Sequence, residues 1–383
     1  MLFIAGPRQV GKTTTSLEGA PGNRYFNWDR QEDRMLITAG GEKIAKELKL
    51  HELKKKPVRI IFDEIHKYSK WKNFLKGFFD THQHQTKIIV TGSARLNIYK
   101  RGGDSLMGRY FLYRMHPLSL AELRLQGSQL RNTEIQKPKK VSQGDLEQLL
   151  TFGGFPEPFI RSSTRFYNRW KNLRLEQLFH EDLRELTAVQ DIGQIRVLAE
   201  ILSNLSGQLT NYSALANRVN ISVDTVKRWI AIMESIYYCF SIRPWYKNVN
   251  KSLKKQPKTY LWDWSLVKDT GSKTENFIAC SLLKAVHFWT DIGLGSYDLF
   301  YLRDTGKREV DFLVTKNNEP WFLVEAKTSN QASLNPSLSF FQNQTKAKHA
   351  FQVDLSSPFV DRDCFAYTEP IKVPGTTFLS QLV

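Results

Sequence analysis

Apolar runs of strand length, each ending in a polar or glycine-rich segment, recur through the first third of the chain. Residues 2–5 are apolar throughout, 58–62 are broken only by Arg59, and 87–91 have an apolar centre. Runs of this kind are typical of strands that are buried on both faces of a parallel sheet. The pattern therefore predicts an α/β domain with a parallel sheet over residues 1–120.

Helical spacing replaces these runs in the middle of the chain. Residues 121–205 are expected to be mainly helical, as a lid or connection. Residues 206–264 then contain two short amphipathic helices, 212–219 and 223–234, followed by two strand-like segments. Two helices and a hairpin in this order are a winged-helix pattern.

A second α/β pattern occupies the end of the chain, residues 265–383. A helix is predicted over 273–289, and strands are predicted at 298–303, 309–314 and 321–327. A short turn separates the last two strands, which indicates an antiparallel pair.

Composition and charge narrow the class of protein. The 383 residues suit two or three domains, and they include 41% hydrophobic and 12% aromatic residues, so wholesale disorder is excluded. No apolar run approaches the ~20 residues that a membrane-spanning helix needs, so no membrane partner is expected. Three distant cysteines, Cys239, Cys280 and Cys364, show neither a disulfide framework nor zinc spacing, which favours a cytoplasmic location.

A glycine-rich loop follows the first predicted strand directly. The pattern G-x-x-x-x-G-K-T binds nucleotide phosphates when it stands between a strand and a helix, as it does here. We expect Lys12 to contact the β- and γ-phosphates of ATP and the Thr13 hydroxyl to hold Mg²⁺. The expected nucleotide-binding residues of this loop are Gly6, Pro7, Arg8, Gln9, Val10, Gly11, Lys12, Thr13 and Thr14.

An acidic pair, Asp63-Glu64, ends the second apolar run. Ligands of open α/β sheets bind at the carboxyl ends of the strands, so the pair is expected near the phosphate loop. Asp63 is expected to hold Mg²⁺ through water, and Glu64 to polarise the attacking water. Ser93, or alternatively Thr91, is the candidate polar side chain between the phosphates and that water.

Two arginines, Arg95 and Arg109, are candidates for contact with the γ-phosphate, although surface ion pairing explains each equally well. The motif by which GTPases read guanine, N/T-K-x-D, does not occur in the chain. Small-molecule kinases usually lack the adjacent Asp-Glu pair. ATP hydrolysis is therefore the favoured reaction.

A second group of acidic and basic residues lies near the end of the chain. Side chains alternate along a strand, so Glu325 and Lys327 share one face, and Asp311 on the neighbouring strand can meet both. Together with Glu275 from the preceding helix, Asp311 and Glu325 offer oxygen ligands for Mg²⁺, and Lys327 offers a cation near an attacking water. A fold kept for packing or DNA binding, with ordinary ion pairs, is the alternative.

The charge balance points to a polyanionic partner. The 55 Lys and Arg exceed the 38 Asp and Glu, giving +17, and basic clusters bind phosphate backbones. A merely cationic surface explains the total equally well, and winged helices also serve only to pack against neighbouring domains. The candidate DNA contacts are Lys227, Arg228, Lys251, Lys254 and Lys255.

With these motifs in this order, the chain resembles prokaryotic predicted AAA+-superfamily ATPases that end in an uncharacterised domain related to restriction endonucleases. The resemblance extends over essentially the whole chain and rests on Gly6–Thr14, Asp63–His66, Thr91–Ser93, Gly108-Arg109, Pro117–Ser119, Gly153–Glu157, Glu275-Asn276, Val310–Phe312 and Glu325–Lys327. It implies an ATPase core, a helical lid, a winged helix and a nuclease-like end. Family members usually have a few dozen residues before the phosphate-loop strand, whereas Met1 lies within it, which leaves open a fragment, a misplaced start or a trimmed adenine pocket.

The resulting hypothesis is an ATP-binding, AAA+-like protein that hydrolyses ATP and couples hydrolysis to a DNA-directed, nuclease-like C-terminal module. The alternative is a nucleotide-dependent regulatory or DNA-binding switch whose last domain cuts nothing. ATP and Mg²⁺ are the expected cofactors, DNA is the expected macromolecular partner, and an oligomer stays open.

Overall fold

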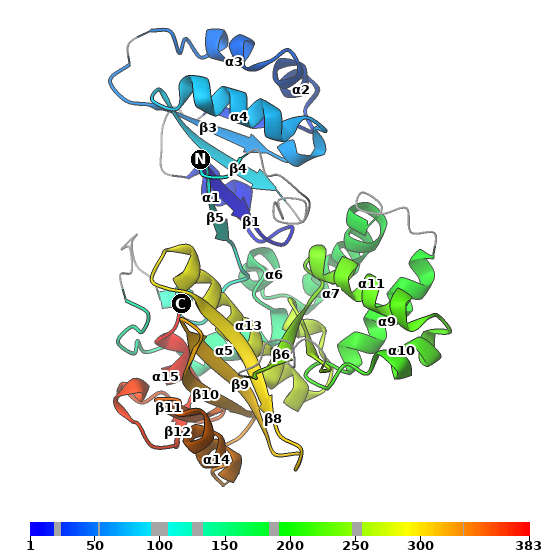
Figure 1. Ribbon diagram of the computed structural model, residues 1–383, viewed down its shortest axis with the longest axis vertical. Coiled ribbons are helices and arrows are strands. Elements are labelled where there is room, and N and C mark those ends of the chain that lie inside the picture. Colours follow the sequence, from blue (N-terminus) through cyan, green and yellow to red (C-terminus); the bar gives the residue numbers. More distant parts are fainter. Residues whose placement is uncertain are drawn as a thin grey trace. The chain divides into compact units, whose positions relative to one another are not determined.

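The fold is seen in a computed structural model, which describes residues 1–18, 24–52, 54–92, 106–124, 133–183, 191–246, 255–331 and 333–383. The chain divides into two compact units, Met1–His116 and Pro117–Val383 (Figure 1). The first unit ends close to the expected limit at residue 120, and the second contains everything that follows. Among the helices of the described residues, none combines the length and apolar character needed to cross a membrane.

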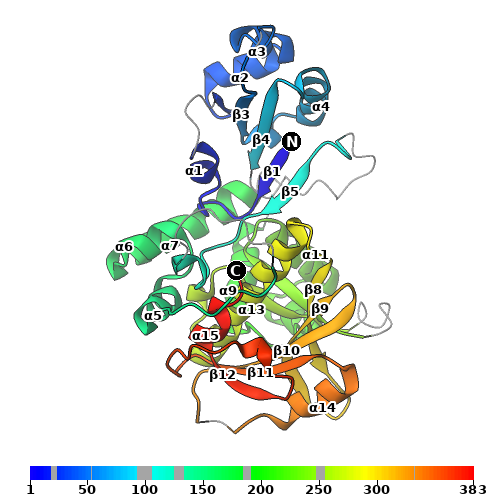
Figure 2. The same cartoon turned by 90° about the vertical axis from the view of Figure 1, so that its left-hand side faces the viewer.

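A five-stranded sheet, parallel throughout, forms the centre of the first unit, in the order β2-β3-β4-β1-β5. Its strands are β1 (Leu2–Ala5), β2 (Arg24–Asn27), β3 (Val58–Asp63), β4 (Thr86–Gly92) and β5 (Phe111–Arg114). Its helices are α1 (Lys12–Leu17), α2 (Gln31–Thr38), α3 (Gly41–Glu47) and α4 (Trp71–His82), with a 3₁₀ turn η1 (Ile65–Lys67). Figure 2 shows α1 on one side of the sheet and α4 on the other.

The expected strands of this unit are confirmed because their side chains are buried on both faces. Ile60, Ile61 and Phe62 of β3 are fully buried, and Phe62 packs edge-on against Phe78 of α4. Burial of whole runs of this kind requires helices on both sides of the sheet.

The second unit begins with helices and ends in a seven-stranded mixed sheet, in the order β12-β11-β10-β9-β8-β6-β7. The helices before the sheet are α5 (Gln143–Phe152), α6 (Pro156–Arg161), α7 (Thr164–Glu176), a π-helical segment η5 (Gln177–Asp182), α9 (Ile192–Asn204), α10 (Tyr212–Val219) and α11 (Val223–Ser235). The strands are β6 (Cys239–Pro244), β7 (Lys258–Leu261), β8 (Tyr297–Arg303), β9 (Glu309–Lys316), β10 (Glu319–Lys327), β11 (His349–Asp354) and β12 (Ile371–Pro374). Three further helices are α13 (Thr270–Asp291), α14 (Pro336–Thr345) and α15 (Gly375–Ser380), and short 3₁₀ turns lie at Glu122–Arg124, Trp264–Leu266 and Cys364–Ala366.

Helices pack on both faces of this sheet. Phe277 and Trp289 of α13 pack with Phe312 of β9 in one core, whereas Leu338 and Phe341 of α14 contribute to a separate core on the other face. The long helix α13 runs beside β8 and β9 in Figure 1. The antiparallel pairing of β9 with β10 is as the short turn predicts.

The helix pair at 212–219 and 223–234 is confirmed, and Ser222 accepts a hydrogen bond from the Thr225 amide (3.1 Å) at the start of α11. The hairpin that follows was expected to form the wing of a winged helix, but it lies elsewhere. Strand β6 pairs in parallel with β8, Arg243 opposite Phe300, so the β6–β7 hairpin belongs to the C-terminal sheet. The expected boundary at 264/265 therefore runs through one sheet, because the edge of β8 offers β6 backbone partners that a free hairpin lacks.

Candidate nucleotide site and carboxylate cluster

The phosphate loop connects β1 with α1 and is closed over its own lysine. The Lys12 ammonium donates to the carbonyl oxygens of Gly6 (2.9 Å) and Pro7 (2.6 Å). Gln9 (φ 63°) and Gly11 (φ 102°) have left-handed backbones, which turn the chain tightly around the ammonium. A Cβ on Gly6 would lie 2.3 Å from the Met115 carbonyl oxygen, so this position requires glycine. The remaining expected residues, Arg8, Val10, Thr13 and Thr14, lie in or directly after the same loop.

Asp63 is the centre of the polar network beside this loop. Its Oδ2 accepts hydrogen bonds from the Thr13 hydroxyl and from the Tyr25 hydroxyl, both at 2.8 Å, and its Oδ1 accepts from the Thr91 hydroxyl at 2.5 Å. Thr91 reaches Asp63 because the two residues are paired in the register of β3 and β4. The expected Mg²⁺ ligands Thr13 and Asp63 thus touch, and two hydroxyls besides Thr13 hold the carboxylate in place.

Tyr25 is a member of this site that the sequence did not reveal. It lies on β2, a four-residue strand with one buried residue, which leaves no apolar run to detect. Burial, followed by its hydrogen bond to Asp63, raises the pKa of the Tyr25 phenol above its usual value. The phenol therefore stays protonated and can only donate to the carboxylate through its hydrogen.

Glu64 follows Asp63 in a left-handed conformation (φ 55°), at the turn between β3 and η1. Its Oε2 is buried and has no hydrogen-bond partner among the described residues, although the Lys67 ammonium lies 3.6 Å away and His66 Nε2 lies 3.7 Å away. Burial raises the pKa of this carboxyl, while Lys67, Lys12 and Arg8 oppose the rise. A buried acceptor without a partner is uncommon and suits a water molecule.

The predicted residues of the C-terminal sheet come together. The Asp311 Oδ2 accepts from the Ala326 amide (3.0 Å), which ties β9 to β10 next to Glu325. The Glu325 Oε1 accepts from the Lys327 ammonium (2.9 Å) and from the Asn335 amide group (2.8 Å). Burial, followed by the charge of Asp311, raises the pKa of Glu325.

An additional lysine, Lys258, lies at the centre of this carboxylate cluster. Its ammonium is 2.6 Å from Glu309, 3.1 Å from Glu275 and 3.4 Å from Asp311. The Tyr260 hydroxyl donates to the same Glu275 oxygen at 2.7 Å. The sequence did not predict Lys258 and Glu309 as members of this cluster. A lysine that ends a basic stretch and an acid at the start of a strand are both typical of exposed positions.

The expected magnesium site at Glu275, Asp311 and Glu325 is not formed in this arrangement. Within the described residues, no group of three or more His, Cys, Asp or Glu side chains is placed to hold a metal ion. Two of the three expected ligands, Glu275 and Asp311, contact Lys258 instead. The ammonium of Lys258 neutralises the negative charge of these carboxylates. These residues do not fit a metal ion as they stand.

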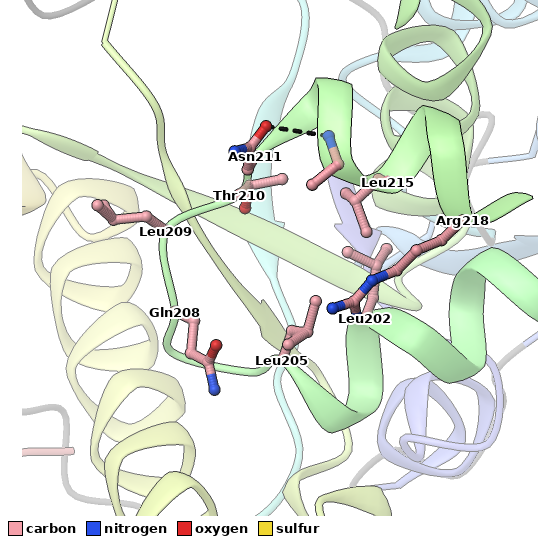
Figure 3. Close-up of a pocket in the computed structure, with 9 residues that line it drawn as sticks. Leu202, Leu205, Gln208, Leu209, Thr210, Asn211, Leu215 and Arg218 are labelled. Carbon is pink, nitrogen blue, oxygen red and sulfur yellow. Dashed lines mark hydrogen bonds between the residues drawn. The ribbon is translucent and has the colours of Figure 1, made fainter. Parts of the chain in front are cut away.

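A separate hollow of about 170 Å³ lies between the end of α9 and α10 (Figure 3). None of the predicted site residues lines it. Asn211, which lines the hollow, accepts a hydrogen bond from the Ala214 amide (3.1 Å) and so serves as the cap of α10. The lining residues are Leu202, Leu205, Gln208, Leu209, Thr210, Asn211, Ala214, Leu215 and Arg218.

Comparison with protein families agrees with the geometry of the phosphate loop. Residues 1–124 match the family model described as an AAA domain. The first unit is thus of the AAA type. Residues 143–274 and 270–362 match two domains of unknown function, DUF8612 and DUF4143, so the restriction-endonuclease relationship expected for the far end is not established by these matches.

Two relatives that match over most of the chain are themselves uncharacterized proteins. A Methanocaldococcus jannaschii protein is 26% identical over 338 residues, which cover 82% of this chain and 72% of that protein. A Mycobacterium tuberculosis protein is 21% identical over 352 residues, covering 86% and 70%. A solved structure of the Aeropyrum pernix ORC1 protein in complex with DNA covers 73% of this chain and 87% of its own, with 13% identity and a TM-score of 0.28. A score this low carries no argument about fold or function.

Of the other residues expected in the AAA-type unit, Ser93 and Arg95 lie outside the described residues, whereas Arg109 lies within them. The expectation that Arg109 contacts the γ-phosphate is wrong for the site of its own chain. Its carbonyl accepts from the Met1 amino group (2.8 Å), and its guanidinium pairs with Asp80 at 2.7 and 3.0 Å. Arg109 thus lies at the amino ends of β1 and β5, whereas the phosphate loop follows the carboxyl end of β1.

Proposed function

We propose that the AAA-type unit binds ATP with Mg²⁺ at the phosphate loop and hydrolyses it. The observation that carries this proposal is the convergence of Lys12, Thr13 and Asp63 beside Glu64, whose buried Oε2 lacks a hydrogen-bond partner. A nucleotide-binding loop without such an acceptor would support binding alone.

Each residue has a defined task in this proposal. Lys12 exchanges its two backbone carbonyl partners for β- and γ-phosphate oxygens. Thr13 and Asp63 would hold Mg²⁺, which neutralises the charge of the phosphates when bound. Thr91 and Tyr25 keep the Asp63 carboxylate oriented, and Glu64 accepts a hydrogen bond from the attacking water.

Replacement of Lys12 by alanine is expected to abolish ATP binding. The variant removes the cation that the loop encloses, whereas Lys46→Ala, an exposed lysine of α3, leaves the loop intact. Binding of a fluorescent ATP analogue to the full chain measures the effect, and phosphate release should fall with it. Equal binding by wild type, Lys12→Ala and Lys46→Ala would contradict the proposed site.

We further propose that the second unit is directed to DNA. Support comes from the exposed Lys227 and Arg228 on α11, the second helix of the pair. Lys227 contacts only the exposed Asp224 among the acids described near it, at 3.6 Å, so its charge is accessible to phosphate. Lys251 and Lys254 lie outside the described residues, and Lys255 is exposed.

Binding of a labelled DNA duplex is expected to weaken steeply with salt. About six phosphate contacts would lower the affinity by about 10³ or more between 50 and 200 mM salt. The double variant Lys227→Ala/Arg228→Ala should reduce both the affinity and the salt slope, whereas Lys46→Ala should change neither. Affinity that is independent of salt, or of the double variant, would contradict DNA tracking by this helix.

A second candidate function, a switch that does not cut DNA, is favoured by one observation. The Lys258 ammonium contacts Glu275 and Asp311, two of the three carboxylates that were expected to hold the metal ion of a nuclease. The DNA of the binding experiment should therefore stay intact when Mg²⁺ or Mn²⁺ is added. Cleavage that disappears in Asp311→Ala and Lys327→Ala would instead support the nuclease hypothesis.

A further inference from the structure

Lys258 is among the most deeply buried charged side chains of the described residues. Its side chain is 3% exposed, and it stands at the first position of β7, with Glu275 of α13 and two acids of β9 around it. A buried ammonium is costly unless it is paired with acceptors. Here three carboxylates lie within 3.4 Å, so the pairing is more than complete.

The three carboxylates in turn need a cation. Glu275, Glu309 and Asp311 come from a helix and a strand and converge on one point, where like charges would otherwise repel. Burial lowers the pKa of the Lys258 ammonium, but Asp311, Glu275 and Glu309 outweigh that effect and raise it above the usual value. Arg303 also pairs with Glu309, which adds a second positive charge at the edge of the cluster.

The surroundings of Glu275 leave little room for a metal coordination shell. Its Oε1 already accepts from Tyr260 and Lys258. The backbone of Gly207 (φ 80°) closes the other side, since a Cβ on Gly207 would lie 3.1 Å from the carboxyl atoms of Glu275. Mg²⁺ requires near-octahedral oxygen ligands and usually retains several waters, whereas one oxygen of Glu275 is already shared by two donors and Gly207 lies against the carboxyl group.

We infer that Lys258 is the resident cation of this cluster: its ammonium takes the position between Glu275, Glu309 and Asp311 that a divalent metal ion would need. The cluster is therefore assembled without metal, and a divalent ion binds there only after the ammonium is removed. Lys258 also ties the edge of the β6–β7 hairpin to α13 and β9. This inference is independent of ATP hydrolysis and of DNA binding, because it concerns the cation alone.

Titration of the full-length chain with Mn²⁺ in the absence of nucleotide tests this inference, with free Mn²⁺ followed by electron paramagnetic resonance. The variant Lys258→Met removes the charge while keeping most of the volume, and we expect it to bind Mn²⁺ at least about tenfold more tightly than wild type. Lys316→Met is the matched control, because Lys316 also lies on a strand of this sheet but pairs with a single carboxylate, that of Glu134. This variant should bind Mn²⁺ as wild type does. Any weak Mn²⁺ binding at the phosphate loop is common to all three proteins and cancels.

Two outcomes would overturn the inference. One is equal Mn²⁺ affinity of folded Lys258→Met and wild type. The other needs no Lys258 variant to fold: one Mn²⁺ ion bound tightly per wild-type chain, and lost in Asp311→Asn, would show that metal and Lys258 coexist. An unfolding temperature of wild type that is unchanged by a chelator would support assembly without metal, whereas a large decrease would contradict it.

Discussion

Glu64→Gln should bind ATP as wild type does but hydrolyse it about 10²–10⁴-fold more slowly. Glutamine keeps the shape of the side chain while removing the carboxylate, whose buried Oε2 is the acceptor available to a water molecule. Lys12, Thr13 and Asp63 are untouched, so the phosphate contacts remain. Phosphate release and binding of a fluorescent ATP analogue, measured on the same preparation, separate the two effects.

The control for this prediction is Glu42→Gln, an exposed glutamate of α3, which should hydrolyse ATP at the wild-type rate. Glu64 must be deprotonated to accept the hydrogen bond, and burial raises the pKa of its carboxyl. Hydrolysis by wild type should therefore decline as the pH falls, beginning at a higher pH than an exposed glutamate would cause. A wild-type rate in Glu64→Gln would mean that another group orients the water.

Arg174→Met should destabilise the second unit by about 3–5 kcal/mol, because it leaves a buried carboxylate without its counter-charge. The Arg174 guanidinium is fully buried and lies 3.5 Å from Asp263, whose side chain is 2% exposed. It also stacks on the ring of Phe155, 3.9 Å from the ring centre, in the Gly-Gly-Phe-Pro-Glu loop. Methionine fills much of the volume but pairs with neither the charge nor the ring.

Hydrogen exchange of the slowest amides in α7 and β7 of the full chain measures the free energy of unfolding of this unit. Arg169→Met, an exposed position on the same helix, should change that free energy by no more than ~0.5 kcal/mol. Adding Asp263→Asn to Arg174→Met should recover part of the loss, since the orphaned charge is then removed. Equal stability of Arg174→Met and wild type would show that Asp263 finds another partner.

Local sequence patterns identified most elements near the candidate sites correctly. The run at 58–62 became β3 because its side chains are buried on both faces, and Ser222 caps α11 through a contact three residues away. Both signals depend only on neighbours in the chain. Strand β2 was missed because its four residues contain no run, and Tyr25 was missed with it.

Predictions of residue roles were wrong or incomplete where the role depends on contacts between segments far apart in the sequence. The dipeptide Gly108-Arg109 does not reveal at which end of the sheet the arginine lies, and the pairing of β5 with β1 places it away from the phosphate loop. The carboxylates at the far end were found by strand alternation, but Lys258, which determines their chemistry, lies 53 positions before Asp311. A lysine in a basic stretch carries no local signal of burial.

By itself, the sequence determined the phosphate loop, the acidic pair after a buried strand and the gathering of Asp311, Glu325 and Lys327, because each follows from the periodicity of a single element or a short hairpin. Only the tertiary structure decided that Tyr25 and Thr91 hold Asp63, that Arg109 faces Asp80, and that Lys258 lies among three carboxylates. These contacts join residues that strand order and helix packing bring together. Charge neutralisation acts through space, and so the cation of the C-terminal cluster was set by the fold rather than by any motif.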